Sequence, residues 1–130
     1  MSSISNFEDI EGWAKARELT NKIYNVTERD QMSRDFGLRD QLQRASISIM
    51  SNIAEGFERG GNQEFIQFLF QARASCAEVQ SQLYVVKDRD YISEQEFKQI
   101  YGLAQEVSKL ISGFISYLRD SSEEDFKDRN

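Results

Sequence analysis

Two glutamates, Glu55 and Glu58, are the residues whose type and spacing come closest to a catalytic site. Carboxylates three residues apart on a helix hold magnesium in helical nucleotide pyrophosphatases, where a second acidic pair on the next helix completes the site. The next helical segment here offers only Glu64 and Glu78, and these lie too far apart along the chain to act as such a pair. A metal-dependent hydrolase is therefore the weakest function considered, and we assign no metal ligand and no catalytic residue.

The sequence also lacks the residues that other common kinds of catalytic site require. The sequence has no histidine, which removes histidine-based triads, haem held by histidine and most zinc sites. Cys76 is the single cysteine and falls in an apolar helical pattern, which favours a small buried hydrophobe over a reactive thiol. Gly56, Gly60 and Gly61 lack the Lys-Ser/Thr partner of a phosphate-binding loop. We expect no enzymatic activity and no cofactor.

A polar row on one predicted helix is a second candidate. Gln41, Ala45, Ser48, Asn52 and Glu55 are spaced by fours and threes, so they share one helix face beside the apolar one. Small and polar residues at such positions can specify register and partner. Three interpretations stay open: a structural network, a solvated helix face and a ligand site.

Charged residues extend this row. Arg44 and Arg73 could form ion pairs with Glu55 or Glu78. The candidate structural or partner motif comprises seven residues: Gln41, Arg44, Ser48, Asn52, Glu55, Arg73 and Glu78.

The charge pattern does not favour nucleic acid. The chain has 16 basic and 22 acidic residues and a net charge of −6. Affinity for nucleic acid comes mainly from lysine and arginine neutralising phosphates. The arginines of the middle segment are matched by nearby acidic residues, and a spacing of five scatters most of them around a helix. No basic stripe results, and we expect no binding to a membrane either.

Four amphipathic segments have to position these residues. They run from about Phe7 to Glu28, from Arg34 to Arg59, from the N-cap Asn62 to about Arg89, and from Ser93 to Leu118. The polar stretch Arg29–Ser33 is predicted to break the first segment from the second. The chain has no proline, which suits long helices.

The last two segments carry the clearest signal, because their apolar residues alternate spacings of four and three as bundle seams do. The third seam is Phe65, Leu69, Ala72, Cys76, Val79, Leu83 and Val86. The fourth is Phe97, Ile100, Ala104, Val107, Ile111, Phe114 and Leu118. Ser93 and Glu96 form a predicted capping box, and Gly60 is expected to end the second helix.

Three segments carry a second apolar stripe, which is more than one isolated bundle needs. Such stripes fit either an interface between subunits or a wide core face, and we favour the interface. Gly102 and Gly113 support close packing by a neighbour. The candidate subunit interface comprises Met50, Ile66, Phe70, Leu103, Leu110 and Tyr117.

These observations predict an all-α fold, an up-down-up-down four-helix bundle over residues 1–119 followed by a polar tail at 120–130. No stretch is long and apolar enough to cross a membrane, and no signal peptide is visible. We therefore expect a cytoplasmic protein.

The stretch from Gln41 to Glu78 resembles the bacterial four-helix-bundle family whose founding members are encoded in intervening sequences of 23S ribosomal RNA genes. The residues that carry the resemblance are Gln41, Arg44, Ala45, Ser48, Asn52, Ile53, Ala54, Glu55, Gly56, Arg59, Glu64, Phe65, Phe68, Ala72 and Glu78. The resemblance implies a left-handed bundle and a ring-shaped homo-oligomer, commonly a pentamer. It implies no settled activity. Met50 stands where the family often has proline.

We consider three functions, in decreasing order of support from the sequence. The first is a non-enzymatic homo-oligomeric scaffold or adaptor, which binds itself and an RNA or protein partner. The second is a nucleic-acid-binding accessory protein that acts on ribosomal RNA fragments or in a retroelement complex. The third is the metal-dependent hydrolase.

Overall fold

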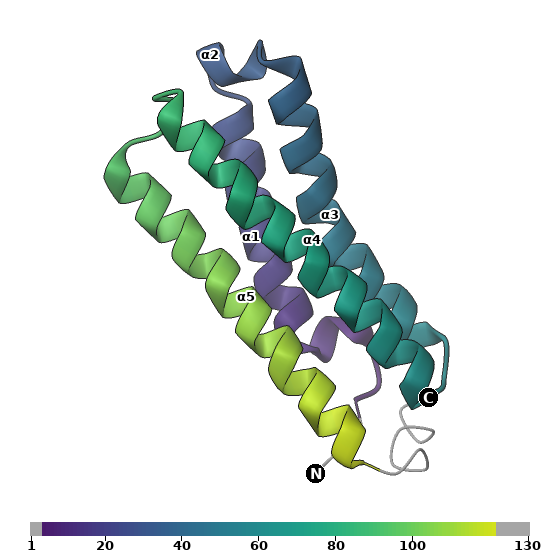
Figure 1. Cartoon of the computed structure of the whole chain (residues 1–130). Helices are drawn as coiled ribbons and strands as arrows, with labels where there is room; N and C mark the ends of the chain where they lie inside the picture. Colours follow the sequence, from purple (N-terminus) through teal and green to yellow (C-terminus); the bar gives the residue numbers. More distant parts are fainter. Residues whose placement is uncertain (1–3, 122–130) are drawn as a thin grey trace.

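The structure, a computed structural model, describes residues 4–121 of the chain. In chain order its elements are the 3-10 helix η1 (Phe7–Asp9) and the helices α1 (Glu11–Thr27), α2 (Asp30–Ser33), α3 (Phe36–Glu58), α4 (Asn62–Asp88) and α5 (Glu94–Asp120). The long helices α1, α3, α4 and α5 lie side by side and antiparallel in Figure 1, and each packs against two others. The all-α, up-down-up-down bundle is confirmed, and its left-handed twist stays a prediction.

The predicted seams form the core of the bundle. All seven seam residues of α4 are buried, from Phe65 to Val86. On α5 the seam shifts at its end, because Ile115 is buried and Phe114 is only half-buried. This shift follows from the helix period of 3.6, which drifts away from a strict 3.5 repeat over several turns. Among the helices of residues 4–121, none combines the length and the apolar character needed to cross a bilayer.

Two predicted boundaries were wrong. The first helix begins at Glu11 and not at Phe7, since Ile10 has an extended backbone that separates η1 from α1. The predicted break at Arg29–Ser33 contains the short helix α2, whose Met32 is buried in the core. Burial of a methionine side chain stabilises by about 1.5–3 kcal/mol, which offsets part of the conformational entropy lost when this turn is ordered. At the other end, α5 includes Asp120, and residues 122–130 of the predicted tail lie outside the described part.

In the α3–α4 connection, the predicted end of α3 is correct, but the predicted N-cap of α4 is not. Gly60 has a φ of +96° and ends α3 as expected. Gly61, however, is the residue that precedes α4, and it offers no side-chain cap. Asn62, predicted as the N-cap, is the first residue of α4 and is buried. Its Nδ2 donates instead to the backbone oxygen of Leu118, 3.3 Å away at the end of α5.

Polar contacts tie the connections together at the opposite end of the bundle. Asp35 accepts a hydrogen bond from the Leu38 N–H at the start of α3 and another from the Tyr91 hydroxyl, at 3.4 and 2.9 Å. The pKa of Tyr91 is raised because its hydroxyl donates to that carboxylate. Arg29 donates two hydrogen bonds to Glu96, at 2.9 and 2.6 Å. Glu96 also completes the predicted capping box of α5, which is confirmed.

The closest approach between helices occurs at Gly56 on α3. A Cβ built on Gly56 would lie 2.7 Å from the Cβ of Phe68 and 2.9 Å from Cδ1 of Phe65, both on α4. These distances are shorter than any ordinary carbon–carbon contact. Glycine therefore lets α3 and α4 pack closely at this point.

Candidate functional site

A hydrogen-bonded cluster lies where the polar row of α3 faces α4. The hydroxyls of Ser48 and Ser75 are 2.9 Å apart. Asn52 donates from Nδ2 to the backbone oxygen and the hydroxyl of Ser48, at 2.9 and 3.0 Å. Each such bond contributes a net stabilisation of about 0.5–1.5 kcal/mol and fixes which side chains meet across the helices. For Ser48 and Asn52, these bonds match the interpretation as a structural network.

A second polar link follows the same face. Gln82 of α4 donates to Oε1 of Gln41 at 3.3 Å. Ser75 and Gln82 had not been recognised from the sequence. They are seven residues apart and each lies beside a seam residue of α4, which is the signal that could have found them. We call the five residues that link α3 and α4 the polar seam: Gln41, Ser48, Asn52, Ser75 and Gln82.

The charged members of the motif do not pair as expected. Glu55 forms its ion pair with Arg59, 2.8 Å away and one turn later on α3. Arg59 also lies 3.7 Å from Glu64 and stacks over the ring of Phe68. The pKa of Arg59 is raised because Glu55 accepts its hydrogen bond.

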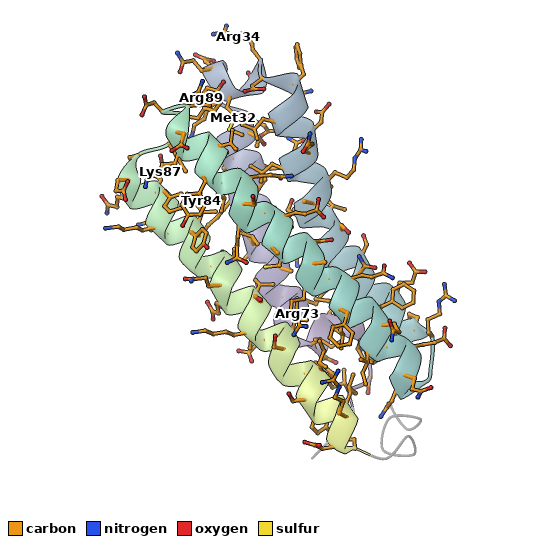
Figure 2. All side chains as sticks on the ribbon, in the orientation of Figure 1. Met32, Arg34, Arg73, Tyr84, Lys87 and Arg89 are labelled. Carbon is orange, nitrogen blue, oxygen red and sulfur yellow. The ribbon has the colours of Figure 1, made fainter. Side chains whose placement is uncertain are left out.

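Arg73 faces the other side of α4. Its Nη1 donates to the hydroxyl of Ser112 on α5 at 3.0 Å, and its guanidinium lies 5.0 Å from the ring centre of Phe70. Figure 2 shows Arg73 on α4 beside α5. The expected pairing of Arg44 or Arg73 with Glu55 or Glu78 is therefore absent from the described residues, because Arg59 engages Glu55 and Ser112 engages Arg73. Arg44 and Glu78 are both exposed.

Glu55 and Glu58 are both exposed, and Glu55 is engaged by Arg59. Among residues 4–121, no three or more carboxylates and cysteines gather in a group that could hold a metal ion. Cys76 is buried, and its Sγ donates to the backbone oxygen of Ala104 at 3.1 Å. Burial raises the pKa of its thiol to about 11. The expected role of Cys76 as a buried hydrophobe is confirmed.

The candidate interface residues lie in different grooves. Met50 packs toward α1, where its sulfur accepts a hydrogen bond from Thr20 at 3.4 Å. Ile66 and Phe70 line a groove at the start of α4, beside α5. All six candidate residues are half-buried, so the structure places part of each side chain against its own subunit.

The α5 members of that set gather on the side facing α1. Leu110 and Tyr117 line a groove of about 400 Å³ that also contains Gly12 and Gly113. Leu103 lies seven residues before Leu110 and shares its face. We call Leu103, Leu110, Gly113 and Tyr117 the α5 outer stripe. A Cβ on Gly113 would meet no atom within 4 Å among the described residues, so this glycine faces open space within the subunit.

Near the other end of α4, an exposed tyrosine, Tyr84, packs against two aromatic rings of α5. Tyr84 is 49% exposed, yet its ring lies 5.0 Å from that of Phe97 and 5.5 Å from that of Tyr101. Lys87 lies over Phe97 and pairs with Glu94. Figure 2 shows Tyr84 and Lys87 on the last turns of α4. This cluster holds the α4–α5 hairpin together.

Comparison with known proteins agrees with this architecture. Residues 8–113 match the model of the 23S rRNA-intervening sequence protein family. No curated protein matches the chain. A crystal structure of a protein with unknown function from the S23 ribosomal protein family of Bacteroides thetaiotaomicron is similar, with a TM-score of 0.74 and 24% identity. The similarity covers 80% of this chain and 97% of that one, and shows the shared fold.

Proposed function

Because the chain belongs to the 23S rRNA-intervening sequence protein family, we propose that it acts as a non-enzymatic, homo-oligomeric helical scaffold or adaptor. The ring-shaped and commonly pentameric assembly implied by the family resemblance is part of this proposal. Its partner is a second copy of the chain and, through the assembled ring, an RNA or protein.

The observation that supports self-association is the α5 outer stripe. Its leucines and tyrosine recur every seven residues and stay half-exposed in the subunit. Gly113 leaves open space beside them, although a glycine inside a helix costs about 1 kcal/mol relative to alanine. A helix of a second copy that packs here would bury apolar surface and approach the glycine closely. Full burial of an exposed leucine stabilises by about 1.5–3 kcal/mol, and these half-buried leucines would gain part of that on assembly.

Phe70 and Ile66 are not needed for this contact. They line a groove with a mostly polar surface on another side of the bundle, whereas the groove beside the α5 outer stripe exposes mostly apolar surface, with Asp9, Glu11 and Lys109 also in its lining. The assembly is therefore proposed to use α5 and the adjoining part of α1.

Light scattering tests the assembly directly. We expect a mass several times the 15.1 kDa of one chain. Leu110→Glu should reduce the mass to that of a monomer while circular dichroism stays helical, because a carboxylate buried without a partner is costly. Gln105→Glu is the matched control, since it adds the same charge at an exposed position on another face of α5.

A wild-type monomer at micromolar concentration would overturn the proposal. An unchanged oligomer in Leu110→Glu would place the contact elsewhere than the α5 outer stripe.

A further inference from the structure

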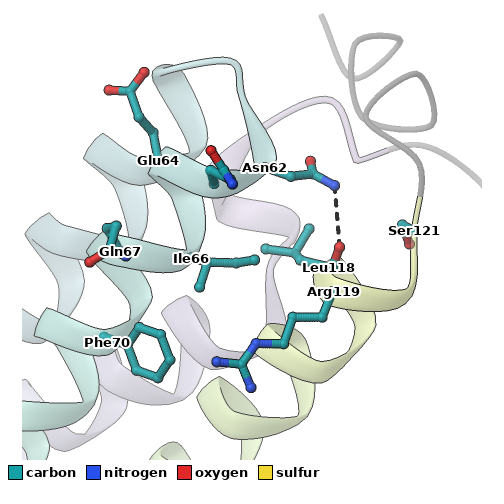
Figure 3. A pocket seen from close by; sticks show the side chains of 9 residues that line it. Asn62, Glu64, Ile66, Gln67, Phe70, Leu118, Arg119 and Ser121 are labelled. Carbon is teal, nitrogen blue, oxygen red and sulfur yellow. Dashed lines mark hydrogen bonds between the residues drawn. The ribbon is translucent and has the colours of Figure 1, made fainter.

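A groove of about 950 Å³ lies where the start of α4 meets the end of α5. Figure 3 shows its lining side chains. Its lining combines apolar, polar and charged side chains, among them Asn62, Glu64, Ile66, Phe70, Leu118 and Arg119. Neither the polar seam nor the α5 outer stripe uses this groove.

One aromatic ring of the groove, Phe70, fixes two guanidinium groups: Arg119 lines the groove, and Arg73 lies just outside its lining. Arg119 lies 5.3 Å from the ring centre of Phe70, and Arg73 lies 5.0 Å from it. In Figure 3 the guanidinium of Arg119 lies alongside Phe70. Ser112 holds Arg73 further through a hydrogen bond of 3.0 Å. Stacking of this kind fixes the side chains before a ligand arrives, which lowers the entropy lost on binding.

These two arginines have no acidic partner in the described part of the chain. No carboxylate of residues 4–121 lies within ion-pair distance of either one. Arg29 and Arg59, by contrast, each bind a glutamate. Glu64 also lines the groove but lies 3.7 Å from Arg59. Arg73 and Arg119 therefore stay available to an anion on a chain whose net charge is −6.

The start of α4 adds further hydrogen-bonding groups. Gly61 offers no side-chain cap, so the first amide N–H groups of this 27-residue helix lack a side-chain acceptor. Free N–H groups and the helix dipole favour an anion at this position. Asn62 is 7% exposed, and its Oδ1 is buried with no hydrogen-bond partner. A buried acceptor without a partner costs about 1–3 kcal/mol, so a donor that reaches it would be favoured.

The occupant must therefore carry anionic groups, at least one N–H or O–H donor, and apolar carbon for Ile66 and Leu118. We propose that this groove binds an acidic peptide segment of a partner protein. Side-chain carboxylates pair with Arg73 and Arg119, and a backbone N–H donates to Oδ1 of Asn62 after that atom, enclosed in the free subunit, turns toward the groove. A long nucleic acid fits less well, because it carries a phosphate at every nucleotide and would extend beyond the groove onto a chain whose net charge is −6, whereas a short peptide stays within the groove.

This inference goes beyond the scaffold role. One chain forms the whole groove, so peptide binding does not depend on the assembly through the α5 outer stripe. Measuring mass and peptide affinity on the same variants separates the two proposals.

Fluorescence anisotropy with a labelled octapeptide tests the inference. The probe contains glutamate and aspartate around one phenylalanine, and its control carries glutamine and asparagine instead. We expect the acidic probe to bind at least tenfold more tightly. Arg119→Ala should weaken binding at least fivefold with unchanged mass and helicity. Lys98→Ala, which removes an exposed cation from the far end of α5, should change it less than twofold.

Equal binding of both probes, or equal effects of the two substitutions, would overturn the inference.

Two further measurements test the identity of the occupant. The triple variant Glu123→Gln, Glu124→Gln, Asp125→Asn should bind the probe within twofold of wild type. A rise of fivefold or more would show that the chain's own acidic segment competes, and would overturn a partner protein as the occupant. RNA that binds more tightly than the peptide and depends on Arg119 would overturn the peptide as the ligand class.

Discussion

Replacement of Gly56 by alanine tests the closest contact in the bundle. The new Cβ would need to move about 0.7 Å from the Cβ of Phe68, from 2.7 Å to the 3.4 Å of an ordinary contact. That atom is attached directly to the α4 backbone, so α3 and α4 must separate. Overpacking of this kind costs about 1–3 kcal/mol, and we expect the upper end here. Alanine returns about 1 kcal/mol through its better helix propensity. The net loss of stability is therefore about 2 kcal/mol.

Urea unfolding followed by circular dichroism, at one fixed protein concentration, measures this difference. Gly37→Ala is the matched control on the same helix, because a Cβ on Gly37 would meet nothing within 4 Å among the described residues. It should stabilise the protein by about 0.4–1 kcal/mol. Replacement of glycine by alanine is therefore expected to lower the free energy of unfolding at position 56 and to raise it at position 37. If Gly56→Ala were as stable as wild type, the argument for close packing of α3 on α4 at this point would fail.

Four further predictions follow from the structure. Leu69→Ala should destabilise by about 2–5 kcal/mol in the same assay, since Leu69 is 1% exposed in the core; an effect below about 0.5 kcal/mol would contradict its placement. The pKa of Glu96 is lowered because Arg29 donates to it, so this pair stabilises the fold at neutral pH and less as the pH falls below the ordinary glutamate pKa. Glu96→Gln, which keeps the cap, should therefore destabilise at pH 7 and have little effect near pH 3 in urea titrations. Cys76 should react with a thiol reagent at neutral pH only after unfolding, because burial raises its pKa to about 11; rapid labelling of the native protein would contradict this. Non-specific RNA should bind no more tightly than about micromolar at physiological salt in a gel-shift titration, and nanomolar binding with a steep salt dependence would support the nucleic-acid-binding alternative.

The sequence predicted the fold where local signals and burial agree. The seam of α4 was correct at every position because its regular spacing allows only one face to be buried. The capping box of Ser93 and Glu96 was correct because both partners are local. The start of α1 and the helix α2 were missed, since burial of Ile10 and Met32 depends on contacts with distant helices.

The candidate sites were less predictable for the same reason. Ser48 and Asn52 could be identified from the spacing along one helix. Ser75 belongs to the cluster only because α4 places its hydroxyl beside that of Ser48 on α3. Arg73 was assigned to the wrong face, because a helical position beside the seam can turn toward either neighbouring helix. Arg119 was not considered, since its contact with Phe70 joins the end of α5 to the start of α4.

The double use of Asp35 has a consequence for the cooperativity of unfolding. One of its oxygens caps α3 and the other accepts from Tyr91 in the connection between α4 and α5. Fraying of the first turn of α3 and detachment of that connection therefore disrupt contacts to the same carboxylate. We therefore expect the amide hydrogens of the first turn of α3 and of the α4–α5 connection to show coupled protection from exchange with solvent.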